Sequence, residues 1–173
     1  MEISRRDWFL ASMVAWQEIA SAQKAGPAAF RHLNAKSAAE IEALAAQILP
    51  SDETPGAREA GVIYFIDRAL TTFDQDKQEV YRQGMQDMQA KREALFPGSQ
   101  SIAALTAQQQ VELLQATERT DFFQLLRFHT LAGFLGNPSY GGNRDGVGWK
   151  LIGFDHKMAY QPPFGYYDAE TKG

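Results

Sequence analysis

The feature that most constrains the fold is a glycine-rich segment near the carboxyl end, residues 129–154, with the sequence HTLAGFLGNPSYGGNRDGVGWKLIGF. Seven of the 14 glycines in the chain lie within it. Glycine loses more conformational freedom on folding than any other residue, so this density is useful only where the backbone needs positive φ or close approach. We therefore interpret the segment as an ordered loop with a function rather than as a linker.

The residues before this segment show the apolar periodicity of helices. Helices are predicted over about 37–49, 57–71, 75–95 and 120–135, with a shorter one after residue 106. Residues 147–152 are the one plausible short strand. The sequence therefore predicts a mainly α fold: a single domain of about five helices with an irregular, glycine-rich carboxy-terminal segment.

Local signals fix several of the predicted helix starts. Ser37–Glu40 and Thr106–Gln109 have the Ser/Thr-x-x-Glu/Gln pattern of a capping box. Asp52 and Glu53 precede the helix expected at 57, where carboxylates favour the positive helix end. We prefer that interpretation to an acid/base or metal pair, because no other ligand-type residues cluster nearby in sequence.

The amino terminus has the three parts of an export signal. Arg5-Arg6 precede a short apolar stretch, Trp8–Trp16, and Ala20-Ser21-Ala22 provides a small-x-small cleavage site. The paired arginines resemble a twin-arginine signal; the alternative is an ordinary amphipathic helix. The expected organisation is an export signal over 1–22, a connector over 23–36 and a helical domain over 37–173.

Several function classes are disfavoured. The net charge of -4 argues against a nucleic-acid partner, which requires a basic face. Without cysteine the chain has no disulfide, cysteine-bound cluster or thiol nucleophile. It lacks a dinucleotide fingerprint, a Walker loop and a nucleophile elbow. The histidines, His32, His129 and His156, are far apart and show no metal-ligand spacing. We expect no catalytic residue, metal or cofactor site in this chain.

His129 lies on the apolar stripe of the helix predicted at 120–135. One interpretation is a buried histidine bonded to a backbone carbonyl. The other is a contact at a cofactor or subunit boundary. Gly133 and Gly136 are expected to end the helix, followed by Asn137-Pro138.

The residues from Asn137 to Phe154 resemble the small third subunit of the gluconate 2-dehydrogenase family. The resemblance extends to the twin-arginine start, to residues 48–52 and 54–57, and to the His129-Thr130 pair. It implies a non-catalytic subunit that supports folding, assembly and twin-arginine export of a catalytic flavoprotein. The implied partners are an FAD-dependent dehydrogenase of the glucose-methanol-choline type, a haem c subunit where present, and the twin-arginine translocase. The implied location is the periplasm, with membrane association through the complex.

A partner-binding role suits the loop. Aromatic side chains and arginine are common interface anchors, and paired glycines permit close backbone approach. Asn tolerates the left-handed conformation. The predicted partner-binding residues are Tyr140, Gly141, Gly142, Asn143, Arg144, Trp149 and His129, with Arg5 and Arg6 for export.

We expect Trp149 and Ile152 to point inward and Tyr140 and Arg144 to be more exposed. Alternatively, Trp149, Leu151, Ile152 and Phe154 all cover the helices as core. The tail 160–167 is expected to form an extended arm.

Two other functions remain open at this point. One is a free-standing enzyme that uses His129 with Arg144 or Asp145, which requires these side chains to converge in one cleft. The other is a general export chaperone that leaves its client after translocation.

Overall fold

The computed structural model describes residues 29–157 and residue 159. The expectations for the export signal and for the arm at 160–167 lie outside this range. Six α-helices are present in the described part: α2 (Ala35–Ile48), α3 (Val62–Thr71), α4 (Gln78–Leu95), α5 (Ala107–Gln115), α6 (Asp121–Leu135) and α7 (Val147–Leu151). Short 3-10 turns occur at Gln75–Lys77, Ile102–Ala104, Pro138–Tyr140 and Arg144–Gly146. Residues 29–157 contain no β-strand, so the prediction of a mainly α domain is confirmed.

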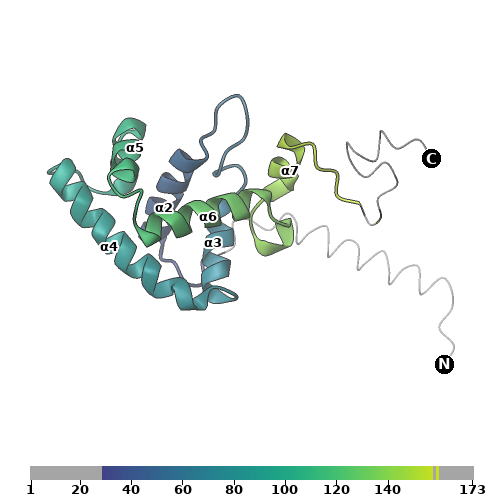
Figure 1. Ribbon diagram of the computed structural model, residues 1–173, viewed down its shortest axis with the longest axis horizontal. Helices are drawn as coiled ribbons and strands as arrows, with labels where there is room; N and C mark the ends of the chain where they lie inside the picture. The colour runs from purple at the N-terminus through teal and green to yellow at the C-terminus, as the bar shows by residue number, and fades with distance from the viewer. Residues whose placement is uncertain (1–28, 158, 160–173) are drawn as a thin grey trace. The chain divides into compact units, whose positions relative to one another are not determined.

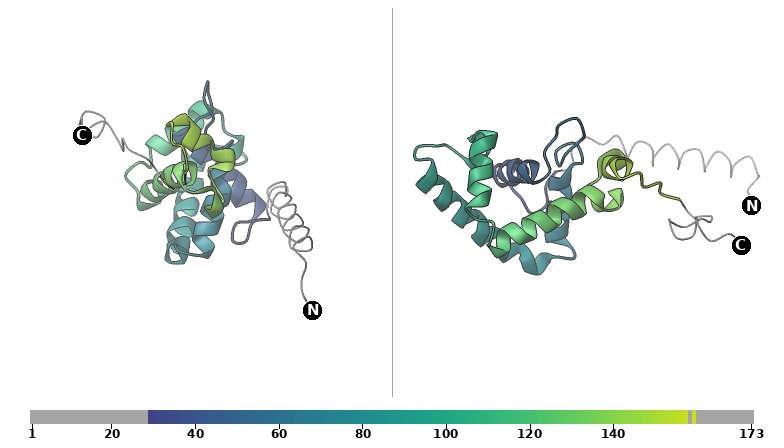
Figure 2. Two further views of the ribbon diagram at one scale, coloured as in Figure 1. Left: turned by 90° about the vertical axis from the view of Figure 1, so that its right-hand side faces the viewer. Right: turned by 45° about the horizontal axis from the view of Figure 1, so that its top comes forward.

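Helix α6 is central to the packing. It contacts α2, α3 and α4, and α7 lies near its carboxyl end (Figure 1). Helices α2 and α5 pack together beside it, and the two further views show the same arrangement (Figure 2). The core side chains come mainly from the apolar stripes of these helices. Those with least exposure include Ile41, Leu44, Ile66, Leu70, Met88, Leu113 and Leu126.

The helix starts show where local signals were sufficient. Thr106 and Gln109 form the predicted capping box on α5. The box predicted at Ser37 is wrong: α2 begins two residues earlier, and the Asn34 side chain accepts from the Ser37 amide at 2.9 Å. An asparagine is as good an N-cap as a serine, and here it stands one turn upstream. Glu40 is consequently not used as a capping residue.

The start of α3 also differs from the prediction. The helix begins at Val62, after turns over 57–61, and its N-cap is Gly61 in a left-handed conformation. Asp52 accepts hydrogen bonds from the Thr54 amide and hydroxyl, at 2.8 and 2.9 Å. It therefore closes its own turn and does not cap a helix, so that interpretation is wrong.

Asp67, on α3, binds the backbone of residues 31–33, which precede α2. Its buried carboxylate accepts hydrogen bonds from the backbone amides of Arg31, His32 and Leu33, at 2.8–2.9 Å. Three donors to one carboxylate form a charge-assisted cluster. Asp67 was not predicted as an anchoring residue, because nothing local in the sequence links it to residues 34–36 positions away.

No helix in the described part of the chain is both long enough and apolar enough to cross a bilayer.

Candidate functional site

The glycine-rich segment is an ordered loop held against the chain's own helices. After α6 ends at Gly136, the chain makes a turn at 138–140, a second turn at 144–146, and then enters α7. Helix α7 replaces the strand predicted at 147–152, and that prediction is wrong. The residues have strand-type composition, but the close contact of Gly148 with α6 favours a compact helical turn.

Two glycines explain why the loop can approach α6. A Cβ atom at Gly142 would overlap the carbonyl oxygen of Gly133, and one at Gly148 would overlap that of Phe134. Gly133 lies inside α6 against the Phe65 ring, so it does not end the helix as predicted. The backbone contacts that these glycines permit are made within the chain.

Asn143 connects the two sides of the loop. It has φ 44° and ψ 43°, and its left-handed conformation confirms the expectation for this residue. Its side-chain amide donates to the Gly136 carbonyl, and its side-chain oxygen accepts from the Gly148 amide, both at 2.9 Å. Only 1% of the residue is exposed. Asn143 therefore acts as an internal brace in this chain.

Tyr140 and Arg144 are exposed, as expected. The Tyr140 ring is half exposed and packs edge-on against Phe73, with ring centroids 6.2 Å apart. The Arg144 guanidinium lies 5.1 Å from the centre of the Tyr64 ring, a cation–π distance. The Arg144 amide donates to the Ala60 carbonyl at 3.0 Å, which ties this part of the loop to the turn before α3.

The Trp149 side chain is partly exposed. Its indole N–H donates to the Leu135 carbonyl at 2.7 Å, and its ring contacts Phe154 at 5.2 Å. Ile152 is 60% exposed, so the expectation that it points inward is wrong. Leu151 and Phe154 are also exposed, which excludes the alternative in which they all become core. Helix α7 is only five residues long and contacts α6, and its Lys150 and Leu151 side chains are exposed in the described chain.

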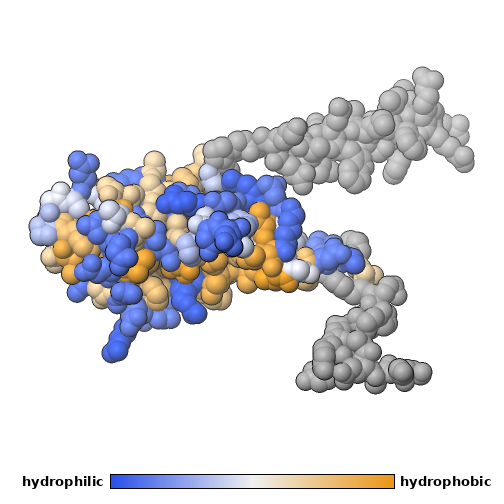
Figure 3. Space-filling view, turned by 90° about the horizontal axis from the view of Figure 1, so that it is seen from above, coloured by the Kyte–Doolittle hydropathy of each residue, from blue (hydrophilic) through white to orange (hydrophobic). Residues whose placement is uncertain are grey.

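Exposed apolar side chains occur before and after the loop in sequence. Besides Tyr140 they are Phe73, Phe128, Leu131, Leu135, Leu151, Ile152 and Phe154. The view from above shows hydrophobic atoms at the end of the described domain from which the carboxy-terminal chain departs (Figure 3). Exposed groups of this kind commonly mark contact sites. Phe73, Phe128 and Leu131 were not predicted as exposed contact residues, because periodicity does not show which apolar positions a small domain leaves uncovered.

His129 is fully buried and bonded to side chains, not to the backbone carbonyl expected. Nδ1 lies 2.9 Å from the Tyr81 hydroxyl, and Nε2 lies 3.0 Å from the Asp74 carboxylate. A carboxylate only accepts, so Nε2 carries the proton and the Tyr81 hydroxyl donates to Nδ1. Burial lowers the pKa of His129, against the opposing effect of Asp74, and burial also raises the pKa of Tyr81.

The structure does not bring His129 together with Arg144 or Asp145. Both ring nitrogens of His129 are engaged inside the core, whereas Arg144 and Asp145 are exposed on the loop. With no exposed surface, His129 offers no direct contact to another molecule in this conformation. A direct catalytic role for the three residues together has no support in this geometry.

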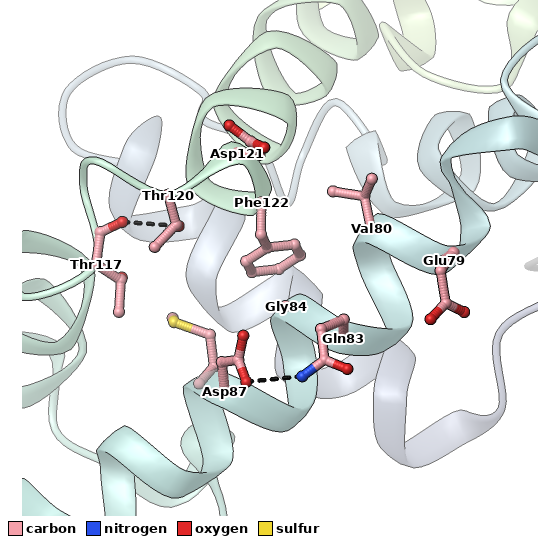
Figure 4. A pocket seen from close by; sticks show the side chains of 10 residues that line it. Glu79, Val80, Gln83, Gly84, Asp87, Thr117, Thr120, Asp121 and Phe122 are labelled. Carbon is pink, nitrogen blue, oxygen red and sulfur yellow. Dashed lines mark hydrogen bonds between the residues drawn. The ribbon is translucent and has the colours of Figure 1, made fainter.

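A separate pocket of about 400 Å³ lies between α4 and the start of α6 (Figure 4). The Phe122 ring points toward α4 and packs directly over Gly84. Glu79, Asp87 and Asp121 lie around the opening, and the Gln83 amide donates to Asp87 at 2.9 Å. Glu79 is paired with Arg82 on the surface. The residues described include no group of three or more histidine, aspartate or glutamate side chains able to hold a metal ion.

The model of the family described as gluconate 2-dehydrogenase subunit 3 matches residues 35–155 of this chain. The matched region contains all of α2–α7 and the whole braced loop. The chain belongs to this family, which confirms the resemblance carried by residues 137–154. Comparison with curated proteins and with solved structures gave no match.

Proposed function

We propose that this chain is the non-catalytic small subunit of a flavin-dependent dehydrogenase that acts on sugars or sugar acids of the gluconate type. The family name implies association with the other subunits of such a complex. The observation that carries the proposal is the loop itself: it is braced from inside by Asn143 and presents Tyr140 and Arg144 outward. A rigid, outward-facing loop suits a docking element.

In this proposal the chain supports folding, assembly and export of the catalytic subunit. FAD resides in that subunit, a flavoprotein of the glucose-methanol-choline type, and haem c resides in a cytochrome subunit where the complex has one. Arg5 and Arg6 address the complex to the twin-arginine translocase. The complex then works in the periplasm, attached to the membrane through another subunit where one is present.

The first docking anchor is the aromatic pair Tyr140 and Phe73. Both rings are about half exposed, and Phe73 in turn contacts the buried Phe65 at 6.0 Å. The pair is therefore held in place before any partner arrives, which reduces the entropy lost on binding. Burying two such rings is the usual way an interface gains affinity from few residues.

The second anchor is Arg144. Its position over Tyr64 orients the planar guanidinium, which is a rigid fork of donors for a carboxylate or for carbonyl oxygens. An exposed arginine that is already oriented is well suited to recognise a hydrogen-bonding partner group. Leu151, Ile152 and Phe154 extend the uncovered apolar surface beyond the loop.

Co-purification tests the docking surface. The full chain is co-expressed with an affinity-tagged flavoprotein of the glucose-methanol-choline type, and the recovered ratio of the two is measured. Tyr140→Ala and Arg144→Ala are expected to lower recovery at least tenfold without changing the thermal midpoint of the isolated chain. Arg119→Ala is the matched control, since that arginine is 95% exposed and lies in the connection between α5 and α6. Full recovery of both loop variants would contradict the proposed surface.

Two further measurements test the non-catalytic assignment and the export role: flavin absorption and activity of the isolated chain, and the cellular location of the flavoprotein. The isolated chain is expected to be colourless and without dehydrogenase activity, and bound flavin or turnover would refute the non-catalytic assignment. Replacing Arg5 and Arg6 together by lysine is expected to leave both this chain and the flavoprotein in the cytoplasmic fraction. If the flavoprotein is still exported with that variant, the proposed export role is refuted, and the proposed docking role is unaffected.

A further inference from the structure

Glu40 is a buried carboxylate that the fold does not use. It lies on α2 and is 4% exposed. Among the residues that the structure describes, no donor is within hydrogen-bond distance of its Oε1 atom. Because Asn34 caps α2, Glu40 also lacks the capping role expected from its position. A buried acceptor without a donor destabilises the folded state, and more so when it is charged.

This carboxylate lines a pocket of about 380 Å³ between the start of α2 and the middle of α4. Leu33, Ile41, Tyr81 and Met85 provide apolar surface in the wall. The polar lining residues are His32, Asn34, Lys36, Ser37, Arg82, Gln86 and Gln89. Glu40 is the one carboxylate among the described residues that line the pocket.

The cations at the opening do not neutralise Glu40. Lys36 is exposed, and Arg82 is already paired with Glu79 and bonded to Gln86. Water and salt screen charges at such exposed positions, whereas a buried carboxylate is screened much less. Oε1 of Glu40 is therefore a buried acceptor without a donor. A positively charged donor would satisfy it best.

We propose that the pocket between α2 and α4 binds a cationic group on an apolar stem, an alkylammonium or alkylguanidinium, with the charged head on Glu40. The stem lies against Leu33 and Met85, the partly exposed apolar residues of the wall, and the head supplies the donor that Oε1 lacks. The same chemistry occurs in a free organic amine and in a lysine or arginine side chain of another subunit. This site is separate from the loop at 137–154, and its failure would leave the proposed function untouched.

Titration of the full chain with n-butylammonium and n-butylguanidinium at pH 7.5 tests the proposal. Methyl-labelled methionine NMR follows Met85, which lines the pocket, and uses the buried Met88 as an internal reference. Saturable shifts are expected, with a dissociation constant of roughly 1–10 mM for so small a probe. Glu40→Gln is expected to weaken binding roughly tenfold or more. Glu42→Gln, on the same helix but paired with Arg58 on the surface, is the matched control and should not change it.

A second variant keeps the test decisive if Glu40→Gln does not fold. Lys36→Gln removes an exposed cation at the opening and is expected to tighten binding of both probes by roughly twofold at low salt. Absence of saturable shifts in the wild type, equal affinity in Glu40→Gln, or weaker binding in Lys36→Gln would each overturn the proposal. Saturable binding of acetate in place of the cations would overturn it as well.

Repeating the titration on the complex with the flavoprotein identifies the source of the cation. Loss of probe binding in the complex assigns the site to a side chain of the partner. Unchanged binding in the complex assigns it to a free amine or guanidine. The thermal midpoint supplies an independent readout: Glu40→Met is expected to raise it by roughly 2–4 °C, because the unmet acceptor is removed. If Glu40→Met lowers the thermal midpoint and Glu40→Gln still binds the probes, the carboxylate has only a structural role.

Discussion

Asn143 offers the sharpest test of how the loop is held. Replacing it with alanine removes two hydrogen bonds of 2.9 Å, one to the Gly136 carbonyl and one from the Gly148 amide. The Gly148 bond is buried, so its loss costs about 1–3 kcal/mol. The Gly136 carbonyl is partly buried and can recruit water, so its loss costs about 0.5–1 kcal/mol. Loss of the two hydrogen bonds in Asn143→Ala should therefore lower the free energy of unfolding by about 1.5–4 kcal/mol.

A glycine at the same position separates the hydrogen bonds from the backbone. At φ 44° alanine is strained, whereas glycine is not, so Asn143→Gly should be less destabilising than Asn143→Ala by about 1 kcal/mol. Asn137→Ala is the matched control within the loop: it loses one exposed bond from the Ser139 amide and should cost less than about 1 kcal/mol.

Urea unfolding of the full chain, followed by circular dichroism, measures these differences. The midpoint should fall in the order wild type, Asn137→Ala, Asn143→Gly, Asn143→Ala, with an unchanged dependence on urea. If Asn143→Ala costs less than about 0.5 kcal/mol, or if glycine is no better than alanine, the brace described here does not stabilise the domain.

Three further predictions concern other positions. Because burial lowers the pKa of His129 below its ordinary 6.5, the unfolded chain binds more protons than the folded one below that pH. Stability should therefore fall as the pH drops below about 6.5, and chemical denaturation at several pH values should show a shallower decline in His129→Gln. Gly148→Ala should displace α7 from α6, because the added methyl overlaps the Phe134 carbonyl, and limited proteolysis should then cut within the loop. Asp67→Asn should cost about 2–3 kcal/mol in urea, since a single amide oxygen cannot replace a carboxylate with three backbone donors.

The helices were predictable because their signals are local. The apolar stripes of α2, α3 and α6 and the capping box at Thr106 depend on residues three or four apart in sequence. The errors at Ser37 and Asp52 have the same origin. Each residue had the right chemistry for a cap, but another nearby residue formed the hydrogen bond instead: Asn34 caps α2, and Asp52 bonds to Thr54.

The loop was predictable as an ordered element but not in its details. Glycine content indicated close backbone approach, yet nothing in the sequence specified that Gly142 and Gly148 would approach the carbonyls of α6. The same limit applies to His129: its place on an apolar stripe predicted burial, but Tyr81 and Asp74 are about 50 residues away and no local pattern joins them. Long-range pairing of polar groups is decided by the packing of whole helices.

The anchoring of residues 31–33 to Asp67 determines how the domain responds to tension. A pull on the chain before residue 31 reaches the domain through three hydrogen bonds to one side chain, before it reaches the first turn of α2. That side chain belongs to α3, the helix packed against α6, so the load passes directly to the middle of the core. A force applied at the amino-terminal end of the described domain would therefore act on α3 through Asp67, and not only on the first turn of α2.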